Sequence, residues 1–234
     1  MFKELIEAFR RQPLIDQMFS EMEAMLDEGV GMFRSVSEVL CGRRELTADV
    51  HDCVYETDRR INHLQRKIRK QLVEHLIVSP GTDVPISLVL MSITKDAERV
   101  GDICKNLLEV AEALGGPIGD DPLGARLTEL LSEIEDLFVP TVAAFQESDK
   151  EVGREAVERS RAIAKECDRA IDELLQSDLP SRTAVLYALA ARYQKRVALH
   201  LSNIASSVVM PLHRLDYYDE KWGDLTKREE GENG

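Results

Sequence analysis

The 234-residue sequence has few aromatic side chains, few cysteines and no long apolar run. Aromatic residues make up 5% of the chain and hydrophobic residues 44%, so the predicted core is mainly aliphatic. The four cysteines form no Cys-x-x-Cys pair, which predicts reduced thiols in a cytoplasmic protein. No apolar stretch is long enough for an integral membrane segment, and the first residues do not follow the pattern of a signal peptide.

The chain has fewer basic than acidic residues: 30 Lys and Arg compared with 43 Asp and Glu, which gives a net charge of −13. Nucleic acids and anionic lipids both select basic surfaces, so this balance argues against a nucleic-acid-binding protein and against electrostatic attachment to a membrane. The His-Glu-x-x-His, phosphate-loop and Glu-x-x-His motifs are missing from the sequence. Since no nucleophile or general base stands out either, we do not expect an enzyme.

Apolar residues recur at helical spacing along almost the whole chain, and no segment sustains the alternation of a strand. An all-α fold is therefore predicted. Thr47 is a candidate N-cap, Gly115 and Pro117 stop a helix, and Pro140 is expected to kink or interrupt one. After a short amphipathic segment near 2–11, the predicted helices are 14–40, 47–78, 85–114, 123–147, 149–177 and 182–210.

The two halves of the chain repeat one another. Residues 56–62 in the second long helix match 166–172 in the fifth, and Arg99 and Asn106 in the third match Arg196 and Asn203 in the sixth. An internal duplication accounts for this order, giving two tandem three-helix bundles. The predicted organisation is a first unit with the short N-terminal helix, a linker, a second unit and a C-terminal tail, at 1–116, 117–122, 123–215 and 216–234.

Two acidic residues mark the one stretch that could carry chemistry. Glu98 and Asp102 are four residues apart, which places both carboxylates on one helix face about 6 Å apart at Cβ, where they repel unless a cation lies between them. Asp58 and Asn62 could add oxygen ligands from the preceding helix. Gly101 costs about 1 kcal/mol inside a helix relative to alanine, so it predicts either a close helix approach or room beside a metal.

Chance is the alternative explanation of this spacing, because acidic residues are frequent on these helices. Other pairs four residues apart are best explained as solvated helix faces: Asp52 with Glu56, Glu129 with Glu133, Glu147 with Glu151, and Glu151 with Glu155.

The run from Ala97 to Asp102, Ala-Glu-Arg-Val-Gly-Asp, followed by Asn106 and Glu109, resembles the signature of the PhoU family of phosphate-uptake regulators. The resemblance implies a fold of two three-helix units and acidic motifs that hold multinuclear metal clusters. Carried over, Glu98, Asp102 and Asp58 are the metal ligands, with Asn62 in place of a second acid. The ion would be divalent or trivalent, with iron, zinc, manganese, magnesium and calcium as candidates.

The second half departs from the family pattern. Lys195 and Leu199 stand at the positions equivalent to Glu98 and Asp102, and neither can ligate a cation. Asp168 and Asp172 remain as a weaker remnant of the site. We expect Lys195 to lie near one of these two carboxylates and to neutralise it in place of a metal.

The resemblance implies a regulator of phosphate transport and phosphate-starvation signalling that acts by protein–protein contact. Its partners would be a component of a phosphate transporter, a phosphate-sensing histidine kinase, or both. The alternatives are an accessory protein of a low-affinity phosphate or sodium–phosphate permease and, less favoured, a metal-dependent hydrolase. A cytoplasmic location is expected, with peripheral attachment to the membrane through a protein partner and homodimer formation both left open.

Overall fold

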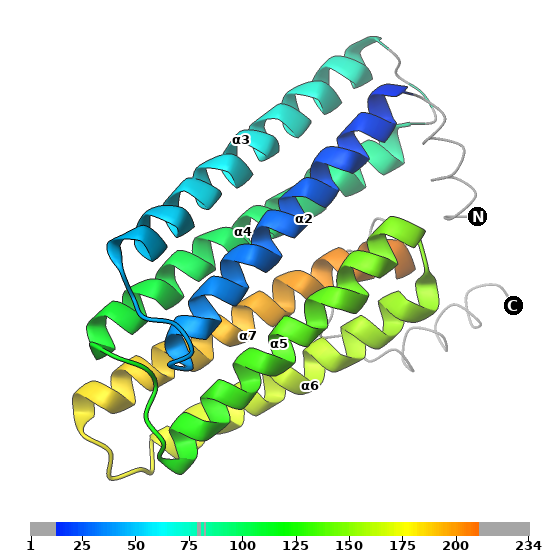
Figure 1. The fold of residues 1–234 in the computed structure, drawn as a ribbon. Coiled ribbons are helices and arrows are strands. Elements are labelled where there is room, and N and C mark those ends of the chain that lie inside the picture. Colours follow the sequence, from blue (N-terminus) through cyan, green and yellow to red (C-terminus); the bar gives the residue numbers. More distant parts are fainter. Residues whose placement is uncertain (1–12, 79–80, 82, 211–234) are drawn as a thin grey trace, which may run out of the picture.

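The structure, a computed structural model, describes residues 13–78, 81 and 83–210. These residues form six α-helices and no strand, which confirms the all-α prediction (Figure 1). The predicted segment at 2–11 and the tail at 216–234 lie outside the described residues. The helices are α2 (Pro13–Leu40), α3 (Ala48–Val78), α4 (Val84–Leu114), α5 (Pro122–Glu147), α6 (Lys150–Leu174) and α7 (Ser181–Val209).

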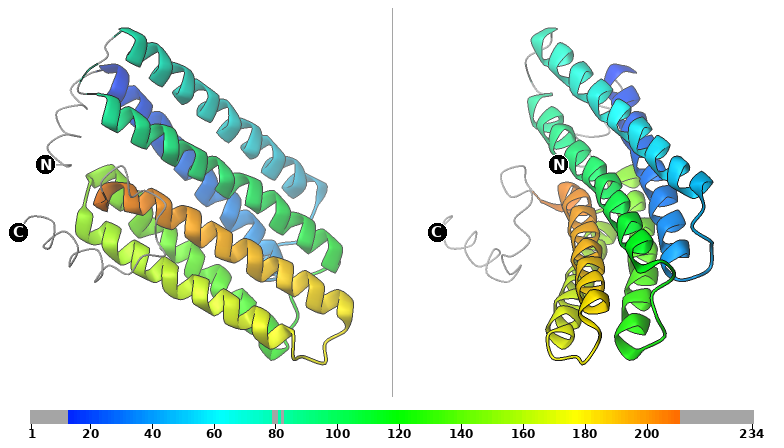
Figure 2. Two further views of the ribbon diagram at one scale, coloured as in Figure 1. Left: turned by 180° about the vertical axis from the view of Figure 1, so that it is seen from behind. Right: turned by 90° about the vertical axis from the view of Figure 1, so that its left-hand side faces the viewer.

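The helices form two antiparallel three-helix units that lie side by side along their length (Figures 1 and 2). In the first unit α2, α3 and α4 pack against one another, and in the second α5, α6 and α7 do the same. Two pairs of helices join the units: α4 packs against α7, and α2 packs against α5. Both faces of α4 and α7 are therefore partly covered, which places their polar side chains in protected positions.

Short-range signals position the connection between the units. Gly115 ends α4 in the left-handed conformation, with a φ of 73°, and its N–H donates to the carbonyls of Ala111 and Glu112. Asp121 caps α5 by accepting hydrogen bonds from the N–H groups of Leu123 and Gly124. The connection also packs on the body, because the N–H of the buried Ile118 donates to the carbonyl of Leu40 at 2.9 Å.

Most predicted helix limits agree with the structure to within one residue, but the structure differs from two of the predictions. The interruption expected at Pro140 does not occur, and α5 is one continuous helix from Pro122 to Glu147. The helix survives because it is held by its apolar face, where Leu137, Phe138 and Thr141 on either side of the proline are buried. At the other end of the second unit, α6 ends at Leu174, three residues earlier than predicted.

The α2–α5 contact is an apolar seam. Phe19 stacks on Phe145 with ring centroids 5.4 Å apart, and Phe33 meets Phe138 at 5.5 Å. Both phenylalanines of α2 are almost completely buried. Thus the phenylalanines among the described residues lie where the two units meet, and most of the remaining core is aliphatic, as predicted.

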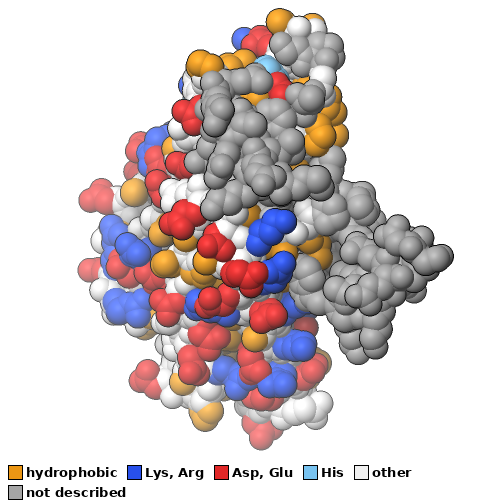
Figure 3. Space-filling model, turned by 90° about the vertical axis from the view of Figure 1, so that its right-hand side faces the viewer, with side chains coloured by type: hydrophobic (Ala, Val, Ile, Leu, Met, Phe, Trp, Pro, Cys, Tyr) orange, Lys and Arg blue, Asp and Glu red, His pale blue; other side chains and the backbone are white. Residues whose placement is uncertain are grey.

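The surface mixes charges of both signs. On the face shown in Figure 3, acidic and basic side chains are interspersed along the molecule. Within the described residues, no helix combines the length and the apolar character that a bilayer span demands.

Candidate functional site

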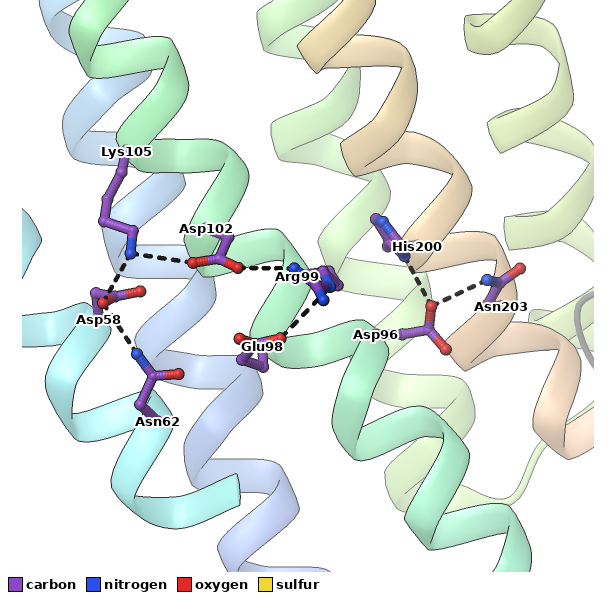
Figure 4. Close-up of polar contacts among 9 residues, drawn as sticks. All are labelled: Asp58, Asn62, Asp96, Glu98, Arg99, Asp102, Lys105, His200 and Asn203. Carbon is purple, nitrogen blue, oxygen red and sulfur yellow. Dashed lines mark hydrogen bonds and ion pairs between the residues drawn. The ribbon is translucent and has the colours of Figure 1, made fainter. Parts of the chain in front are cut away.

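The acidic residues singled out in the first unit lie on facing turns of α3 and α4 (Figure 4). The ammonium group of Lys105 bridges two of them, with its Nζ atom 2.9 Å from Asp58 Oδ2 and 3.0 Å from Asp102 Oδ1. Asp58 comes from α3, whereas Asp102 and Lys105 come from successive turns of α4. The structure therefore brings Asp58 and Asp102 together, as predicted, around a cation supplied by the chain itself.

The remaining predicted residues extend this cluster at both ends. Asn62 donates a hydrogen bond from Nδ2 to Asp58 Oδ2 at 3.0 Å. Arg99 donates to Asp102 Oδ2 at 3.1 Å, and its Nε atom lies 3.7 Å from Glu98 Oε2. Asn62, Asp58, Lys105, Asp102, Arg99 and Glu98 thus form one chain of polar contacts, called here the α3–α4 network (Figure 4).

The electrostatics of the α3–α4 network differ between its two ends. Burial alone lowers the pKa of Lys105, but its hydrogen bonds to Asp58 and Asp102 outweigh burial and raise the pKa above the ordinary lysine value. At the other end, burial and then repulsion from Asp102 raise the pKa of Glu98, against the opposing effect of Arg99. The repulsion inferred from the spacing of Glu98 and Asp102 is therefore present, and it acts on Glu98.

Gly101 is explained by close packing of helices. A Cβ atom at this position would lie 3.2 Å from the terminal methyl group of Ile61 on α3, and 3.8 Å from Asp58 Oδ1. Ile61 is completely buried. The missing side chain leaves room for the end of Ile61, where α4 packs closely on α3.

The fit of these residues to a metal ion depends on Lys105. Asp58 Oδ1 is buried without a hydrogen-bond partner, so this atom is available as a ligand. The other carboxylate oxygen, Oδ2, already accepts hydrogen bonds from Lys105 and Asn62. Both oxygens of Asp102 are likewise engaged, by Lys105 and Arg99. Among the described residues, no group of three His, Cys, Asp or Glu side chains is arranged to hold a metal. In this arrangement the residues do not fit a multinuclear cluster, and a single ion would have to displace Lys105.

In the second unit, Lys195 lies beside one of the two remnant carboxylates, as expected from the sequence. Lys195 on α7 donates to both carboxylate oxygens of Asp168 on α6, at 2.7 and 2.6 Å. Asp172, one turn further along α6, is exposed. Leu199, on the turn of α7 after Lys195, is half buried. The charge of Asp168 is already balanced by Lys195.

A second polar cluster, which the sequence did not predict, joins the two units. Asp96 on α4 receives a hydrogen bond from His200 Nδ1 at 2.7 Å and another from Asn203 Nδ2 at 3.0 Å, both from α7 (Figure 4). Only 6% of Asp96 is exposed. One feature of the sequence could have indicated this contact. Asp96 lies two residues before Glu98 and therefore on a different face of the same helix, so its side chain points to a helix other than the one that Glu98 faces.

The fold defines a class of protein, the tandem three-helix bundle, with its polar side chains placed along α3, α4 and α7. A family model described as the PhoU domain matches residues 15–111, which span the first unit. Two solved PhoU structures share the fold. The phosphate transport system regulatory protein PhoU from Streptococcus pneumoniae has a TM-score of 0.67 and 16% identity, covering 82% of this chain and 94% of its own. PhoU from Pseudomonas aeruginosa has a TM-score of 0.62 and 19% identity, covering 89% and 97%.

Two curated relatives extend over both units. The phosphate-specific transport system accessory protein PhoU homolog 1 of Thermotoga maritima is 22% identical over 211 residues, covering 83% of this chain and 82% of the relative. The PhoU homolog of the same description from Synechocystis is 22% identical over 197 residues, covering 83% and 86%. The PhoU domain match in the first unit and the similarity of both units to PhoU homologs support the prediction of a divergent relative of the PhoU family.

Proposed function

We propose that this protein regulates phosphate transport through contacts with other proteins rather than by catalysis. The observation that carries the proposal is the similarity to two phosphate-specific transport system accessory proteins, which runs through both units of this chain and of the relatives. A regulator needs surfaces and a stable scaffold rather than a reaction centre. The tandem bundle supplies both, because its helices share one continuous apolar core and α3 and α6 expose charged side chains along their length.

The expected partners are a component of a phosphate transporter, a phosphate-sensing histidine kinase, or both. We place the protein in the cytoplasm, where it would reach the membrane only through such a partner. An acidic chain of net charge −13 favours a partner with a basic docking surface, since complementary charge speeds association and selects among partners.

A second candidate is an accessory role for a low-affinity phosphate or sodium–phosphate permease. The observation that favours it is the divergence of the second unit, where the ion pair of Lys195 and Asp168 replaces the acidic motif expected of the family. A protein that has lost one of two family motifs is a reasonable candidate for a changed transporter partner.

The test is deletion of the gene in its host, with phosphate uptake measured in phosphate-rich and phosphate-poor medium. Loss of a regulator should make uptake and the phosphate-starvation response insensitive to external phosphate, and the intact gene should restore the control. Deleting each phosphate transporter in the same background would separate the two candidates, because the deletion phenotype should vanish only with the true partner. Uptake and starvation response unchanged in both media would overturn the proposal.

Metal binding remains a prediction for the first unit alone. The ligands would be Asp58, Glu98 and Asp102, with Asn62 beside them, once Lys105 has moved away from the carboxylates. Oxygen ligands suit hard or borderline cations such as iron, manganese, magnesium, calcium or zinc.

A further inference from the structure

One face of α7 concentrates positive charge in an otherwise acidic protein. The described residues lining a hollow of about 300 Å³ there are all from this helix: Arg192, Lys195, Arg196, Leu199, His200 and Asn203. They are spaced three and four residues apart, so they form one continuous stripe. Three cationic side chains and a histidine therefore face the same small volume.

The two arginines of this stripe form no ion pair with a described residue. Lys195 is bound to Asp168 and His200 is bound to Asp96, so these two side chains are already engaged. Arg192 and Arg196 make no ion pair or side-chain hydrogen bond with another described residue, although the chain has an excess of acidic residues. Like charges four residues apart on a helix repel each other, so an anion between the two guanidinium groups would remove an unfavourable interaction.

The surroundings of Arg196 make this arrangement more specific. Arg196 also lines an adjoining hollow of about 390 Å³, together with Tyr55 of α3 and residues of α4 that include Arg99, Lys105 and Asn106. Asp102 and Glu109 line that second hollow too, and Asp102 is already held by Arg99 and Lys105. Arg196 thus lies where the two units meet, with carboxylates on one side and the α7 stripe, which contains no acidic residue, on the other.

The donors of the stripe suit a tetrahedral oxyanion. A guanidinium group presents paired N–H donors that match two oxygens of a phosphate, and two such groups can hold one anion from two sides. A volume of about 300 Å³ holds a phosphate ion with water or the phosphoryl end of a small metabolite, but not a folded partner.

We propose that the α7 stripe is a binding site for a small phosphate-type oxyanion, either inorganic phosphate or the phosphoryl group of a small metabolite. The proposal rests on charge and geometry and does not depend on the proposed regulatory function. Binding at this site would affect how the two units pack. The anion would lie within one turn of the Asp96–His200 contact and so favour the packed arrangement of α4 against α7.

The test is calorimetric titration of the full chain with inorganic phosphate and, separately, with glycerol phosphate, at constant ionic strength in chloride. Saturable binding of either probe is expected, and the probe that binds more tightly identifies the source of the phosphoryl group. Arg192→Gln with Arg196→Gln should weaken that binding by about tenfold or more, because it removes both charge-assisted donors. Arg59→Gln with Arg66→Gln on the exposed face of α3 removes the same charge and should leave binding within about twofold.

Three results would overturn the site. They are absence of saturable binding by both probes, equal weakening by the α3 control pair, and binding that changes by less than about twofold when Arg192 and Arg196 are both replaced. Far-ultraviolet circular dichroism and thermal unfolding would show whether the variants are folded like the wild-type protein, so that weaker binding is not mistaken for a folding defect. If the stripe variant binds phosphate normally while phosphate control of uptake is lost in cells, the oxyanion site fails and the proposed function stands.

Discussion

The two units treat equivalent aspartates differently. In the first unit, the side chain of Asp58 is 9% exposed and shares Lys105 with Asp102, whereas in the second unit the side chain of Asp168 is 50% exposed and holds Lys195 alone. The first arrangement is a protected network of two carboxylates and one ammonium, with Arg99 and Asn62 at its ends. The second is a single ion pair at the surface.

The lysines also come from different positions of the repeat. In the register that aligns Arg99 with Arg196, Lys195 is equivalent to Glu98, and Lys105 is equivalent to Ser202. Each unit therefore balances the aspartate of its middle helix with a lysine of its last helix, but not with the same lysine. What the two halves share is the need to neutralise this carboxylate, since an unpaired charge between packed helices is costly.

The largest expected effect concerns metal affinity, which should distinguish the two units completely. Glu98→Gln with Asp102→Asn removes two of the three predicted carboxylate ligands, so binding of iron or manganese by the first unit should be lost. Asp168→Asn with Asp172→Asn is the matched control in the second unit and should leave metal content unchanged. Metal analysis after equilibrium dialysis measures both. Equal metal content in the wild type and the first double variant would reject the ligand assignment.

The next largest effect is the loss of stability when Lys105 or Lys195 is replaced. Lys105→Met leaves the buried Asp58 without its cation and should lower the free energy of unfolding by about 2 kcal/mol. Lys195→Met exposes no buried charge, because Asp168 is half exposed, and should cost less than about 1 kcal/mol. Urea unfolding of both variants at neutral pH gives the comparison. Equal losses would mean that the difference in exposure between the two aspartates has no energetic consequence.

If a metal can enter the first unit, Lys105→Met should also raise its affinity, because the ammonium and the ion compete for Asp58 and Asp102. Lys195→Glu with Leu199→Asp is the corresponding change in the second unit, and restored metal binding there would support the interpretation of a remnant site. These two measurements separate competition for ligands from loss of ligands.

The sequence predicted the helices well because their apolar spacing and end signals are local. Gly115 and Asp121 fix the ends of α4 and α5 through hydrogen bonds of their own backbone and side chain to residues within four positions. Pro140 was expected to kink or interrupt its helix, and the interruption does not occur because burial of the surrounding apolar face, a tertiary effect, outweighs the lost backbone hydrogen bond.

The site was predicted only in part, for a related reason. The spacing of Glu98 and Asp102 placed both residues on one face of α4. The side chain of Lys105, however, is long and has many rotamers, and only packing against α3 selects the rotamer that reaches Asp58. The pair of Asp96 and His200 was missed because its members are 104 residues apart and meet only when the units dock. No periodicity within one helix encodes such a contact.

A smaller effect compares a glycine in each unit. Alanine at Gly101 would meet only the end of the Ile61 side chain at 3.2 Å, so the gain of about 1 kcal/mol in helix propensity should roughly balance the adjustment of Ile61. Alanine at Gly153 would meet Val209 at 2.8 Å and the carbonyl oxygen of Ala205 at 3.2 Å, which forces α6 away from α7. Gly153→Ala should therefore lower the free energy of unfolding by about 1 kcal/mol and Gly101→Ala by almost nothing. Denaturant titrations of both variants decide, and a larger loss at Gly101 would contradict the packing argument.

The smallest expected effect tests the repulsion left in the first unit, at Glu98. Because the pKa of Glu98 is raised in the folded protein, first by burial and then by Asp102, the ionised carboxylate costs stability at neutral pH. Between its ordinary value and its raised value the folded state binds more protons than the unfolded state, so stability falls as the pH rises through this window. Glu98→Gln should therefore raise the free energy of unfolding at pH 7, by less than about 1 kcal/mol.

The gain from Glu98→Gln should shrink as the pH falls through that window, because Glu98 is then neutral in both states and resembles glutamine. Asp102 should not behave in the same way, since it is held by both Arg99 and Lys105, and Asp102→Asn should lower stability instead. Glu155→Gln on the exposed face of α6 is the control and should shift stability by no more than about 0.5 kcal/mol at any pH. Urea unfolding of these variants at pH 7 and in mildly acidic buffer gives the required differences. A stabilisation by Glu98→Gln that persists undiminished in acid would show that its origin is packing rather than the charge of Glu98.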